Sequence, residues 1–426
     1  MKRVLVIAYH FPPLAGSSGV QRTLRFVQHL PRHGWTAVVL TCQPRAYDEV
    51  KTDLLADIPA GTIVQRAPAL DTARHLAVAG RYPAWLARPD RWITWWPGAV
   101  WAGRGLIRRL RPSAIYSTYP IATAHVIGHS LERWSGLPWI ADFRDPMAQE
   151  GYPPDPKTWK SFRRVEERVF AHAAACTFTT PGAARAYRAT FPHSRARMEV
   201  IENGYDEDSF AEVERASPKA EAPRSGARIL LHSGIVYPSE RDPRQLFAAL
   251  ASLKQRGIGA HRLQVRFRAA VHESFLTSLG LQHGVEDMIE VAPHLQYRDA
   301  LREMVQADGL LLLQAANCNE QIPAKLYEYL RAGRPVLAFT DPAGDTAGAL
   351  RASGISAIAR LDNSSEIAAV LARFADGELG GMVARADAIA HASRQARAEQ
   401  LARLLDEVAD RPQTHGDAAC RRVEPA

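Results

Sequence analysis

The sequence predicts an α/β protein of two domains, each built on a parallel sheet with crossover helices. Three observations support this prediction. The chain has 426 residues, which suits two α/β domains of about 200 residues each. Short apolar runs alternate with helical patterns, which is typical of parallel strands joined by helices. A polar stretch at 212–228, which contains Pro218 and Pro223 and has no apolar period, separates two such series.

Six apolar runs predict the strands of the first domain. They lie at 4–9, 38–41, 114–117, 139–142, 177–180 and 199–201. A helix is expected after the loop at 10–19, because Val20, Leu24 and Val27 recur on one face at three- and four-residue spacing. A second helix is expected around 123–134, between the third and fourth strands.

The second domain repeats this pattern. Its predicted strands lie at 229–232, 264–267, 288–291, 309–313 and 336–339. The last helical pattern, at about 365–408, includes segments that could pack back across the first domain. We therefore expect a first domain at 1–205, a linker at 206–228, a second domain at 229–409 and a polar tail at 410–426.

The composition is that of a globular protein with a mild basic excess. Its residues are 46% hydrophobic and 23% charged, and the formal net charge is +8. Such an excess favours anionic partners, namely nucleotide diphosphates, lipid head groups or nucleic acid, without choosing among them.

The cysteines and the lengths of the apolar runs indicate in which cellular compartment the protein is expected. The four cysteines are scattered, with neither CxxC nor metal-ligand spacing, which indicates reduced thiols in a cytoplasmic protein. No apolar run reaches the roughly 18 to 20 residues that span a bilayer. The N-terminal apolar run soon meets His10 and Pro12, so we interpret it as a buried strand and not as a signal peptide.

The most informative segment runs from 309 to 339 and reads strand, polar loop, short helix and strand. Pro323 suits the first turn of the helix. In a doubly wound sheet, ligands bind at the loop that leaves the carboxyl end of a strand, and a helix N-terminus there attracts phosphate. Glu320 falls in that loop and Glu328 in the second turn of the helix, so both carboxylates could meet one extended ligand. Lys325 lies between the two glutamates and could neutralise the charge of a diphosphate. The three residues together suit a nucleotide sugar. The alternative is a surface helix with two solvated glutamates.

The spacing Glu320-x7-Glu328, followed by Gly333-x-Pro335, resembles the Glu-x7-Glu motif of retaining family-4-type glycosyltransferases. The resemblance implies the GT-B fold, which is two Rossmann-like domains facing across a cleft. It also implies transfer from a nucleoside-diphosphate sugar with retained configuration and without a metal or other cofactor. In that family the second glutamate holds the ribose and the first contacts the donor sugar, which assigns these roles to Glu328 and Glu320.

The segment 231–243 resembles the first strand and loop of the family's second domain, where a Gly-Arg pair and a lysine hold the donor diphosphate. Gly234 matches the glycine, but Ile235 stands where the arginine would be. This departure leaves Arg241 as the only close cation, so we assign the phosphate to Arg241 and Lys325 together. The alternative for Arg241 is a salt bridge within its own loop, for example with Asp242.

A DxD sequence at 206–208 is not interpreted as a metal site. The motif belongs to a different glycosyltransferase fold, and these residues lie beside the predicted linker. We therefore expect no metal site.

A glycine- and serine-containing loop opens the first helix. Gly16, Ser17, Ser18 and Gly19 would let the backbone approach an anion closely at a helix N-terminus. The spacing is not GxGxxG, so a dinucleotide cofactor is not expected. The matching loop of the resembled family lines the cleft, and the alternative is a plain tight turn.

Charged residues follow the strand predicted at 139–142. Asp142, Arg144 and Asp145 lie where its carboxyl end should reach the cleft. They could orient acceptor hydroxyls or stabilise the departing diphosphate, so we expect catalytic roles for Asp142 and Arg144. Asp-Phe-Arg-Asp-Pro also resembles one bacterial branch of the family. The alternative is a buried salt-bridge network, and no catalytic histidine is assigned, because His125 falls on the helix.

Residues 81–109 hold five of the nine tryptophans, interleaved with arginines. Tryptophan and arginine together suit a bilayer interface, which would serve a lipid-linked acceptor. The alternative is a helical lid whose tryptophans pack on the core. Single-stranded nucleic acid could also use such residues, but no nucleic-acid-binding motif accompanies them, so nucleic acid is not an expected partner.

We therefore expect a glycosyltransferase that moves a sugar from a nucleoside-diphosphate sugar to a hydroxyl of a glycan or lipid-linked acceptor. Bacterial surface polysaccharide or glycolipid synthesis is the expected process, at the inner face of the plasma membrane. Two alternatives remain. One is an enzyme of the same fold such as a non-hydrolysing epimerase, and the other is a non-catalytic protein that binds sugar nucleotides.

Overall fold

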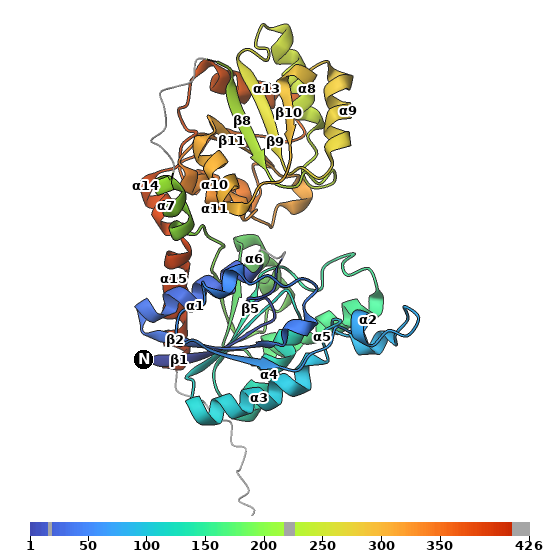
Figure 1. The fold of residues 1–426 in the computed structure, drawn as a ribbon, viewed down its shortest axis with the longest axis vertical. Coiled ribbons are helices and arrows are strands. Elements are labelled where there is room, and N and C mark those ends of the chain that lie inside the picture. Colours follow the sequence, from blue (N-terminus) through green and yellow to red (C-terminus); the bar gives the residue numbers. More distant parts are fainter. Residues whose placement is uncertain (16–18, 217–225, 411–426) are drawn as a thin grey trace, which may run out of the picture.

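The computed structural model describes residues 1–15, 19–216 and 226–410. Two α/β domains follow one another along the long axis of the molecule (Figure 1). One is built on a seven-stranded sheet and the other on a six-stranded sheet, and every paired strand is parallel to its neighbour. The predicted fold class is confirmed.

The N-terminal sheet has the order β3-β2-β1-β4-β5-β6-β7. Its strands are β1 (Lys2–Ala8), β2 (Trp35–Cys42), β3 (Ile63–Ala67), β4 (Ala114–Thr118), β5 (Trp139–Phe143), β6 (Ala175–Phe178) and β7 (Arg197–Val200). β4 and β5 are buried along their whole length and β1 is buried from Val4 to Ala8, as expected of parallel strands covered on both faces. The chain order reverses between β1 and β4, and ligands bind at such a switch point in open α/β sheets.

Helices connect these strands and cover the sheet. They are α1 (Gly19–His29), α2 (Thr72–His75), α3 (Trp95–Leu110), α4 (Thr123–Ser135), α5 (Pro156–His172) and α6 (Pro181–Thr190). Capping residues fix where α5 and α6 begin. The side chain of Asp155 accepts from Thr158 N, and that of Thr180 accepts from Ala183 N. A proline occupies the first position of each helix.

The C-terminal sheet has the order β10-β9-β8-β11-β12-β13. Its strands are β8 (Arg228–Ser233), β9 (Leu263–Arg268), β10 (Ile289–Ala292), β11 (Gly309–Leu313), β12 (Val336–Phe339) and β13 (Ile358–Ala359). The helices around it are α8 (Arg244–Gln255), α9 (Glu273–His283), α10 (Tyr297–Gln306), α11 (Lys325–Ala332), α12 (Asp345–Ala352), α13 (Ser364–Asp376) and α14 (Ala386–His391). All five predicted strands are present, within one residue at either end.

The segment predicted as a linker begins with a helix. α7 (Glu207–Ala216) buries Phe210 and Val213 in a core that also contains Leu301 and Met304 of α10. The apolar residues of α7 are too few to show a helical period in the sequence. Residues 217–225, in the rest of the predicted linker, lie outside the described residues.

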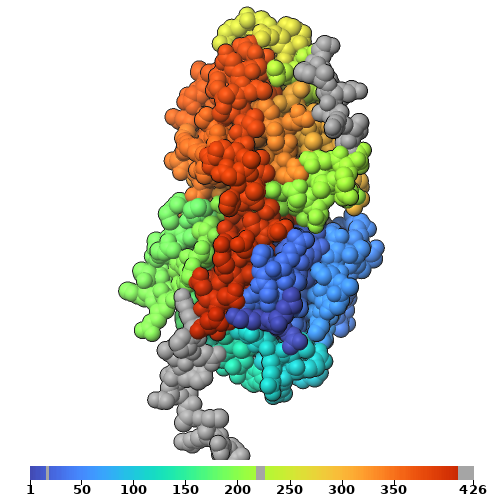
Figure 2. All heavy atoms as spheres, turned by 90° about the vertical axis from the view of Figure 1, so that its left-hand side faces the viewer, coloured from blue at the N-terminus to red at the C-terminus, as the bar shows by residue number. Residues whose placement is uncertain are grey.

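The last helix returns to the N-terminal domain. α15 (Arg394–Ala409) runs along the outer face beside the N-terminal segment (Figure 2). Its Leu401 and Leu405 are buried against Leu24 and Val27 of α1, and each buried leucine contributes roughly 1.5–3 kcal/mol. The expectation that the last helical pattern packs back across the first domain is therefore confirmed. None of the helices in the described part of the chain is long and apolar enough to cross a bilayer.

Candidate functional site

The helix of the 309–339 segment lies at the border between the domains. α11 begins two residues after Pro323, and Gly333 caps it in the left-handed conformation with φ +66. The apolar side chains of α11 point into the C-terminal core, which leaves Lys325 and Glu328 only partly buried. The loop at 314–324 connects β11 to this helix, so the predicted order of strand, loop, helix and strand is confirmed.

Glu328 lines a cavity of about 530 Å³ between the two domains. This volume lies within the range of small-molecule sites. The phenol of Tyr297 donates a hydrogen bond to Glu328 Oε1 at 3.0 Å. Burial raises the pKa of Glu328, and nearby Arg394 opposes the shift. The wall of this cavity on the N-terminal domain is formed by α1 and the loop after β5, and α15 closes one side. The charged residues that line the cavity are Arg22, Arg25, Arg144, Glu202, Glu328, Arg394 and Arg397.

Three of the five arginines in this cavity are neutralised by carboxylates. Arg25 forms an ion pair with Asp206 at 3.1 Å, and Arg397 pairs with Glu202 at 2.5 Å. Arg22 pairs with Asp142, as described below. These arginines therefore serve mainly to hold the cavity wall.

The other two arginines form no direct ion pair with a carboxylate of the described residues, although Asp145 lies near Arg144 and Glu328 near Arg394. Arg144 Nη1 donates to the carbonyl of Gly19 at 2.9 Å. Arg394 donates to the carbonyl of Gly204 at 2.8 Å and to Gln21 Oε1 at 3.2 Å. Burial lowers the pKa of both guanidinium groups. Because a partly buried cation without a direct ion pair is costly, the two arginines favour an anionic ligand at this cavity.

Glu320 lines a second and smaller cavity, of about 90 Å³. Its side chain is exposed, and its backbone carbonyl accepts a hydrogen bond from Thr180 Oγ1 at 2.6 Å. Arg241 lies in the same lining, while Arg144 and Asn203 line both cavities. The two glutamates therefore line different cavities, and one ligand could contact both only by passing Arg144.

Lys325 lies beside the first loop of the C-terminal domain. Gly234 has φ +107, which other residues rarely adopt, and a Cβ there would crowd Lys325 Nζ at 3.1 Å. Lys325 Nζ is also 3.4 Å from His232 Nε2, and His232 Nδ1 is 3.0 Å from the carbonyl of Leu311. Burial and the nearby Arg241 lower the pKa of Lys325 to about 7.

Arg241 does not form the salt bridge considered as its alternative. Asp242 pairs with Arg244 at 2.5 Å, while Arg241 Nη1 donates to the carbonyl of Ile235 at 2.6 Å. The guanidinium also lies over the ring of Tyr237, at 5.1 Å from its centroid. Arg241 and Lys325 are therefore two neighbouring cations at the carboxyl end of β8.

Asp142 does not reach either cavity, which corrects the expectation that it contacts substrate. Its side chain is completely buried and accepts from Arg22 Nη2 at 2.9 Å and Arg22 Nε at 3.1 Å. The hydroxyls of Thr118 and Thr177 donate to it at 2.8 and 2.7 Å. Although burial acts against ionisation, the Arg22 charge and these hydrogen bonds lower the pKa of Asp142 to about 2. The alternative interpretation of this segment, a buried salt-bridge network, therefore applies to Asp142. The role of Asp142 is to position Arg22.

Other residues of the sequence analysis have clear structural positions. His125 is completely buried, and its Nδ1 lies 2.8 Å from Ser117 Oγ. Asp206 pairs with Arg25 and accepts from Ser209 at the start of α7. Gly19 is the first residue of α1. The predicted cleft-loop residues Gly16, Ser17 and Ser18 lie outside the described residues.

Four arginines and a tyrosine of the larger cavity were not predicted from the sequence. Arg22 and Arg25 lie one turn apart on α1, as Arg394 and Arg397 do on α15. Arginines at this spacing are common on solvated helix faces, so the spacing alone does not indicate a site. Their role depends on α15 crossing to the N-terminal domain, which brings the two pairs together.

Comparison with known proteins finds a family domain in the N-terminal half of the chain and a shared fold for the whole chain. Residues 18–204 match the family model of a glycosyl transferase 4-like domain. A search of curated protein sequences finds no match. The structure is similar to sucrose-phosphate synthase from Thermosynechococcus elongatus, with 14% identity, a TM-score of 0.64, and coverage of 96% of this chain and 99% of that chain.

Two further solved structures share the arrangement. A glycosyltransferase from Rickettsia africae has 11% identity and a TM-score of 0.65, over 96% of this chain and 99% of that chain. HepE of Anabaena in complex with UDP has 15% identity and a TM-score of 0.64, over 96% of this chain and 100% of that chain. At such low identities, these similarities establish the shared two-domain fold.

Proposed function

We propose that this chain, a family-4-type glycosyltransferase with the GT-B fold, transfers a sugar from a nucleoside-diphosphate sugar to a hydroxyl acceptor. The observation that carries the proposal is the interdomain cavity in which Glu328 lies with two arginines that form no direct ion pair with a carboxylate of the described residues. A nucleoside diphosphate offers complementary groups to both. Its ribose hydroxyls can donate to the carboxylate, and its phosphate oxygens can accept from the guanidinium groups.

In this proposal the donor extends from the larger cavity to the smaller one. The nucleoside occupies the larger cavity, with its ribose at Glu328, and the diphosphate passes Arg144 towards Arg241 and Lys325. The sugar then meets Glu320. The smaller cavity, at about 90 Å³, is below the usual size of a ligand site, so the domains must separate to admit the sugar. HepE, which shares the fold, has been crystallised with UDP and with UDP-glucose, which supports a donor of this kind.

The cations beside the proposed diphosphate suit its departure. Negative charge grows on the diphosphate as the glycosidic bond breaks, and fixed cations in a closed cleft stabilise that charge without reorganising. Arg144, Arg241 and Lys325 supply three such groups, so we propose that transfer needs no metal. Retention of configuration, which the resemblance implies, is part of the same proposal.

The acceptor side of the proposal rests on the tryptophan-rich segment. Trp95 is buried in the core, as a lid would require, whereas Trp85 and Trp101 are 68% and 82% exposed. Arg104 and Arg108 are exposed on the same helix as Trp101, and α3 contains no acidic residue. Exposed tryptophan beside unopposed arginine fits an anionic membrane surface. We propose a glycan or lipid-linked acceptor of bacterial surface polysaccharide or glycolipid synthesis, met at the inner face of the membrane.

Replacing Glu328 tests the donor site. UDP-, GDP-, ADP- and TDP-sugars would be screened by thermal shift, and the best donor titrated into wild type and Glu328→Ala. Loss of hydrogen bonds from ribose to a charged group costs about 1.5–3 kcal/mol each, so affinity should fall at least about tenfold. Glu378→Ala, at an exposed glutamate of the same domain, serves as the control. Unchanged donor affinity in a folded Glu328→Ala protein would refute the ribose assignment.

An acceptor panel separates transfer from the two alternatives. A transferase consumes the donor in proportion to the glycosylated acceptor. Turnover of the donor without any acceptor would indicate an epimerase instead. Donor binding with no turnover under either condition would indicate a sugar-nucleotide-binding protein.

A further inference from the structure

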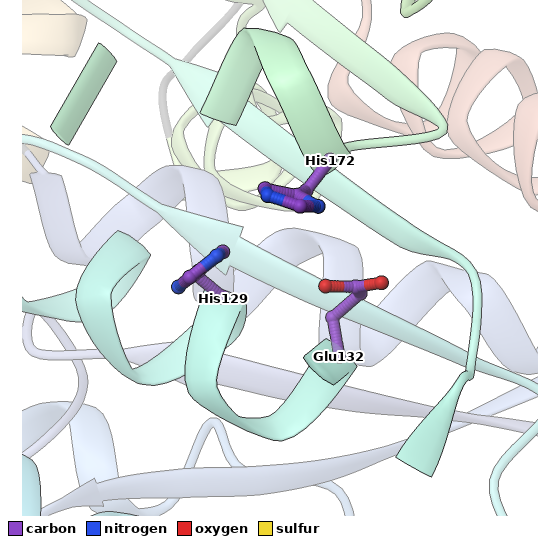
Figure 3. Close-up of side chains that lie close together, drawn as sticks. All are labelled: His129, Glu132 and His172. Carbon is purple, nitrogen blue, oxygen red and sulfur yellow. The ribbon is translucent and has the colours of Figure 1, made fainter. Parts of the chain in front are cut away.

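Three metal-ligating side chains meet on the N-terminal domain, away from the cleft. His129 and Glu132 lie one turn apart on α4, and His172 is the last residue of α5. Figure 3 shows the three side chains directed towards one another. One ligand atom from each lies within 4.8 Å of the other two. No other group of three or more such residues at this spacing is found in the described ranges.

The polar groups of this cluster form no hydrogen bond or ion pair within the described part of the chain. Glu132 Oε2 is buried and has no hydrogen-bond partner among residues 1–15, 19–216 and 226–410. The rings of His129 and His172 contact each other, with centroids 4.8 Å apart. A buried carboxylate oxygen without a partner is costly and rare. A ligand that accepts its lone pair would remove this cost.

The position of the cluster on its helices favours a cation. Glu132 lies in the last turn of α4, and His172 is at the C-terminus of α5. The C-terminal ends of helices carry partial negative charge, and here two of them converge. Arg133 and Arg168 oppose a cation at this place.

We propose that His129, Glu132 and His172 form a Zn²⁺ site. Two imidazole nitrogens and one carboxylate oxygen are a preferred donor set for zinc, with water in the fourth position. Ligand atoms around a tetrahedral zinc lie about 3.3 Å apart, so the side chains must close by roughly 1.5 Å. His172 is exposed and Glu132 only partly buried, so small rotations of the side chains suffice.

The site is separate from sugar transfer. The C-terminal ends of α4 and α5 precede β5 and β6, so the cluster lies at the amino edge of the sheet. The proposed reaction lies at the opposite, carboxyl edge, where Arg144 follows β5. Zinc at this site would join α4 to α5, and its expected effect is on the stability of the N-terminal domain.

Metal titration of the whole protein tests the site. Protein stripped with EDTA and dialysed should bind one Zn²⁺ per chain. Its melting temperature should rise by about 4 °C or more when free zinc is a hundredfold above its dissociation constant. Co²⁺ in place of zinc should give the visible absorption of a tetrahedral site. His172→Ala should weaken zinc binding at least tenfold and remove this absorption, and Glu132→Gln should do the same.

Matched controls make the outcome decisive. His172 is exposed, so its replacement by alanine should leave the melting temperature in EDTA unchanged. His193→Ala, at another exposed histidine of the same domain, should keep both the zinc affinity and the Co²⁺ absorption of the wild type. Equal zinc affinity in His172→Ala and wild type would overturn the proposal, as would the absence of a 1:1 complex at micromolar zinc.

Discussion

At the scale of single residues, some charged groups in and behind the cleft are neutralised by an ion pair with another protein group, and others are not. The carboxylate of Asp142 receives four hydrogen bonds and is fully buried. Arg144 and Arg394 have only carbonyl or amide partners among the described residues. A satisfied ion pair maintains the structure, whereas an unsatisfied cation beside a cavity is available to a ligand.

The buried pair of Asp142 and Arg22 should matter for stability. Asp142→Asn would leave a buried guanidinium without its counter-charge, which costs about 3–5 kcal/mol. The folded-state pKa of Asp142, about 2, lies below the unfolded value. The stabilisation is therefore complete above about pH 4 and is lost as the pH falls towards 2. Urea unfolding at several pH values should show this loss, and Asp299→Asn, at a half-exposed site on α10 whose ion pair is with Arg302, should show only a small part of it.

Lys325 predicts how donor binding depends on pH. Its pKa is lowered to about 7, and a diphosphate beside the ammonium group would raise it again. At about pH 8, donor binding should therefore take up close to one proton, whereas at about pH 6 the uptake should be small because Lys325 is already protonated. Calorimetry in Tris and HEPES, whose ionisation heats differ, measures this uptake.

Two variants decide whether Lys325 is the group that takes up the proton. Lys325→Gln should bind the donor more weakly and without proton uptake at pH 8. Lys254→Gln, at a lysine that pairs with Asp287 elsewhere in the same domain, should behave like the wild type. The same proton uptake in Lys325→Gln would assign it to another group.

Sequence reasoning placed some of these residues at the cleft and misplaced others, for physical reasons. Glu320, Glu328 and Lys325 lie close to the carboxyl end of one predicted strand, so local order was sufficient. Asp142 ends its own strand, but the last residues of a buried strand can point into the domain as well as into the cleft. Arg394 could not be predicted, because its position depends on where a helix at the far end of the chain docks.

At the scale of elements, burial determines which strands could be predicted. β11 is apolar throughout and β1 is apolar from Val4 onwards, and the sequence predicts both strands. β3 was missed, because this edge strand contains Gln65 and Arg66 and its Ile63 is 38% exposed. β13 has only two residues, and α7 anchors itself with just two buried side chains. Short or half-exposed elements thus depend on tertiary packing that no local pattern reveals.

Helix α3 allows the proposed membrane contact to be tested. Its buried face contains Ala99, Gly103 and Leu106, which leaves Trp101 and the arginines outside. Each arginine near an anionic membrane contributes about 1 kcal/mol, so Arg108→Glu with Arg109→Glu should reduce binding to anionic vesicles more than tenfold. Trp101→Ala should also weaken it.

Cosedimentation with anionic and neutral vesicles measures this contact. Tyr237→Ala, at an exposed aromatic residue of the C-terminal domain, should bind like the wild type. Binding that is equal for both kinds of vesicle, or unaffected by the charge reversals, would contradict a membrane role for α3.

At the scale of the whole molecule, the domains touch on two sides of the cleft. On one side, α15 passes from one domain to the other, and Arg394 N donates to the carbonyl of Tyr205 at 2.9 Å. On the other side, the N-terminus of α6 meets the C-terminal domain. Asp345 accepts hydrogen bonds from the backbone of Gly182 and from Arg185. The α15 side is covalently continuous, so opening the cleft must break the α6 side.

Gly182 therefore offers a test of domain closure. A Cβ at this position would lie 2.6 Å from Asp345 Oδ2 and 2.9 Å from the Cα of Glu320. Because the second contact is with backbone, a side-chain rotation cannot relieve it, and Gly182→Ala should keep the domains slightly apart. Misplacing reacting groups by about 1 Å can cost a hundredfold in rate, so kcat/KM should fall at least tenfold.

The stability of the N-terminal domain should not fall in this variant, because alanine suits a helix better than glycine. Gly105→Ala is the matched control, since a Cβ there meets no atom within 4 Å. Small-angle scattering with saturating donor should show a larger radius of gyration for Gly182→Ala than for the wild type and the control. If Gly182→Ala reached the wild-type radius and rate, contact between α6 and the Glu320 loop would not be needed for transfer. The donor sugar would then have to be enclosed by the C-terminal domain alone.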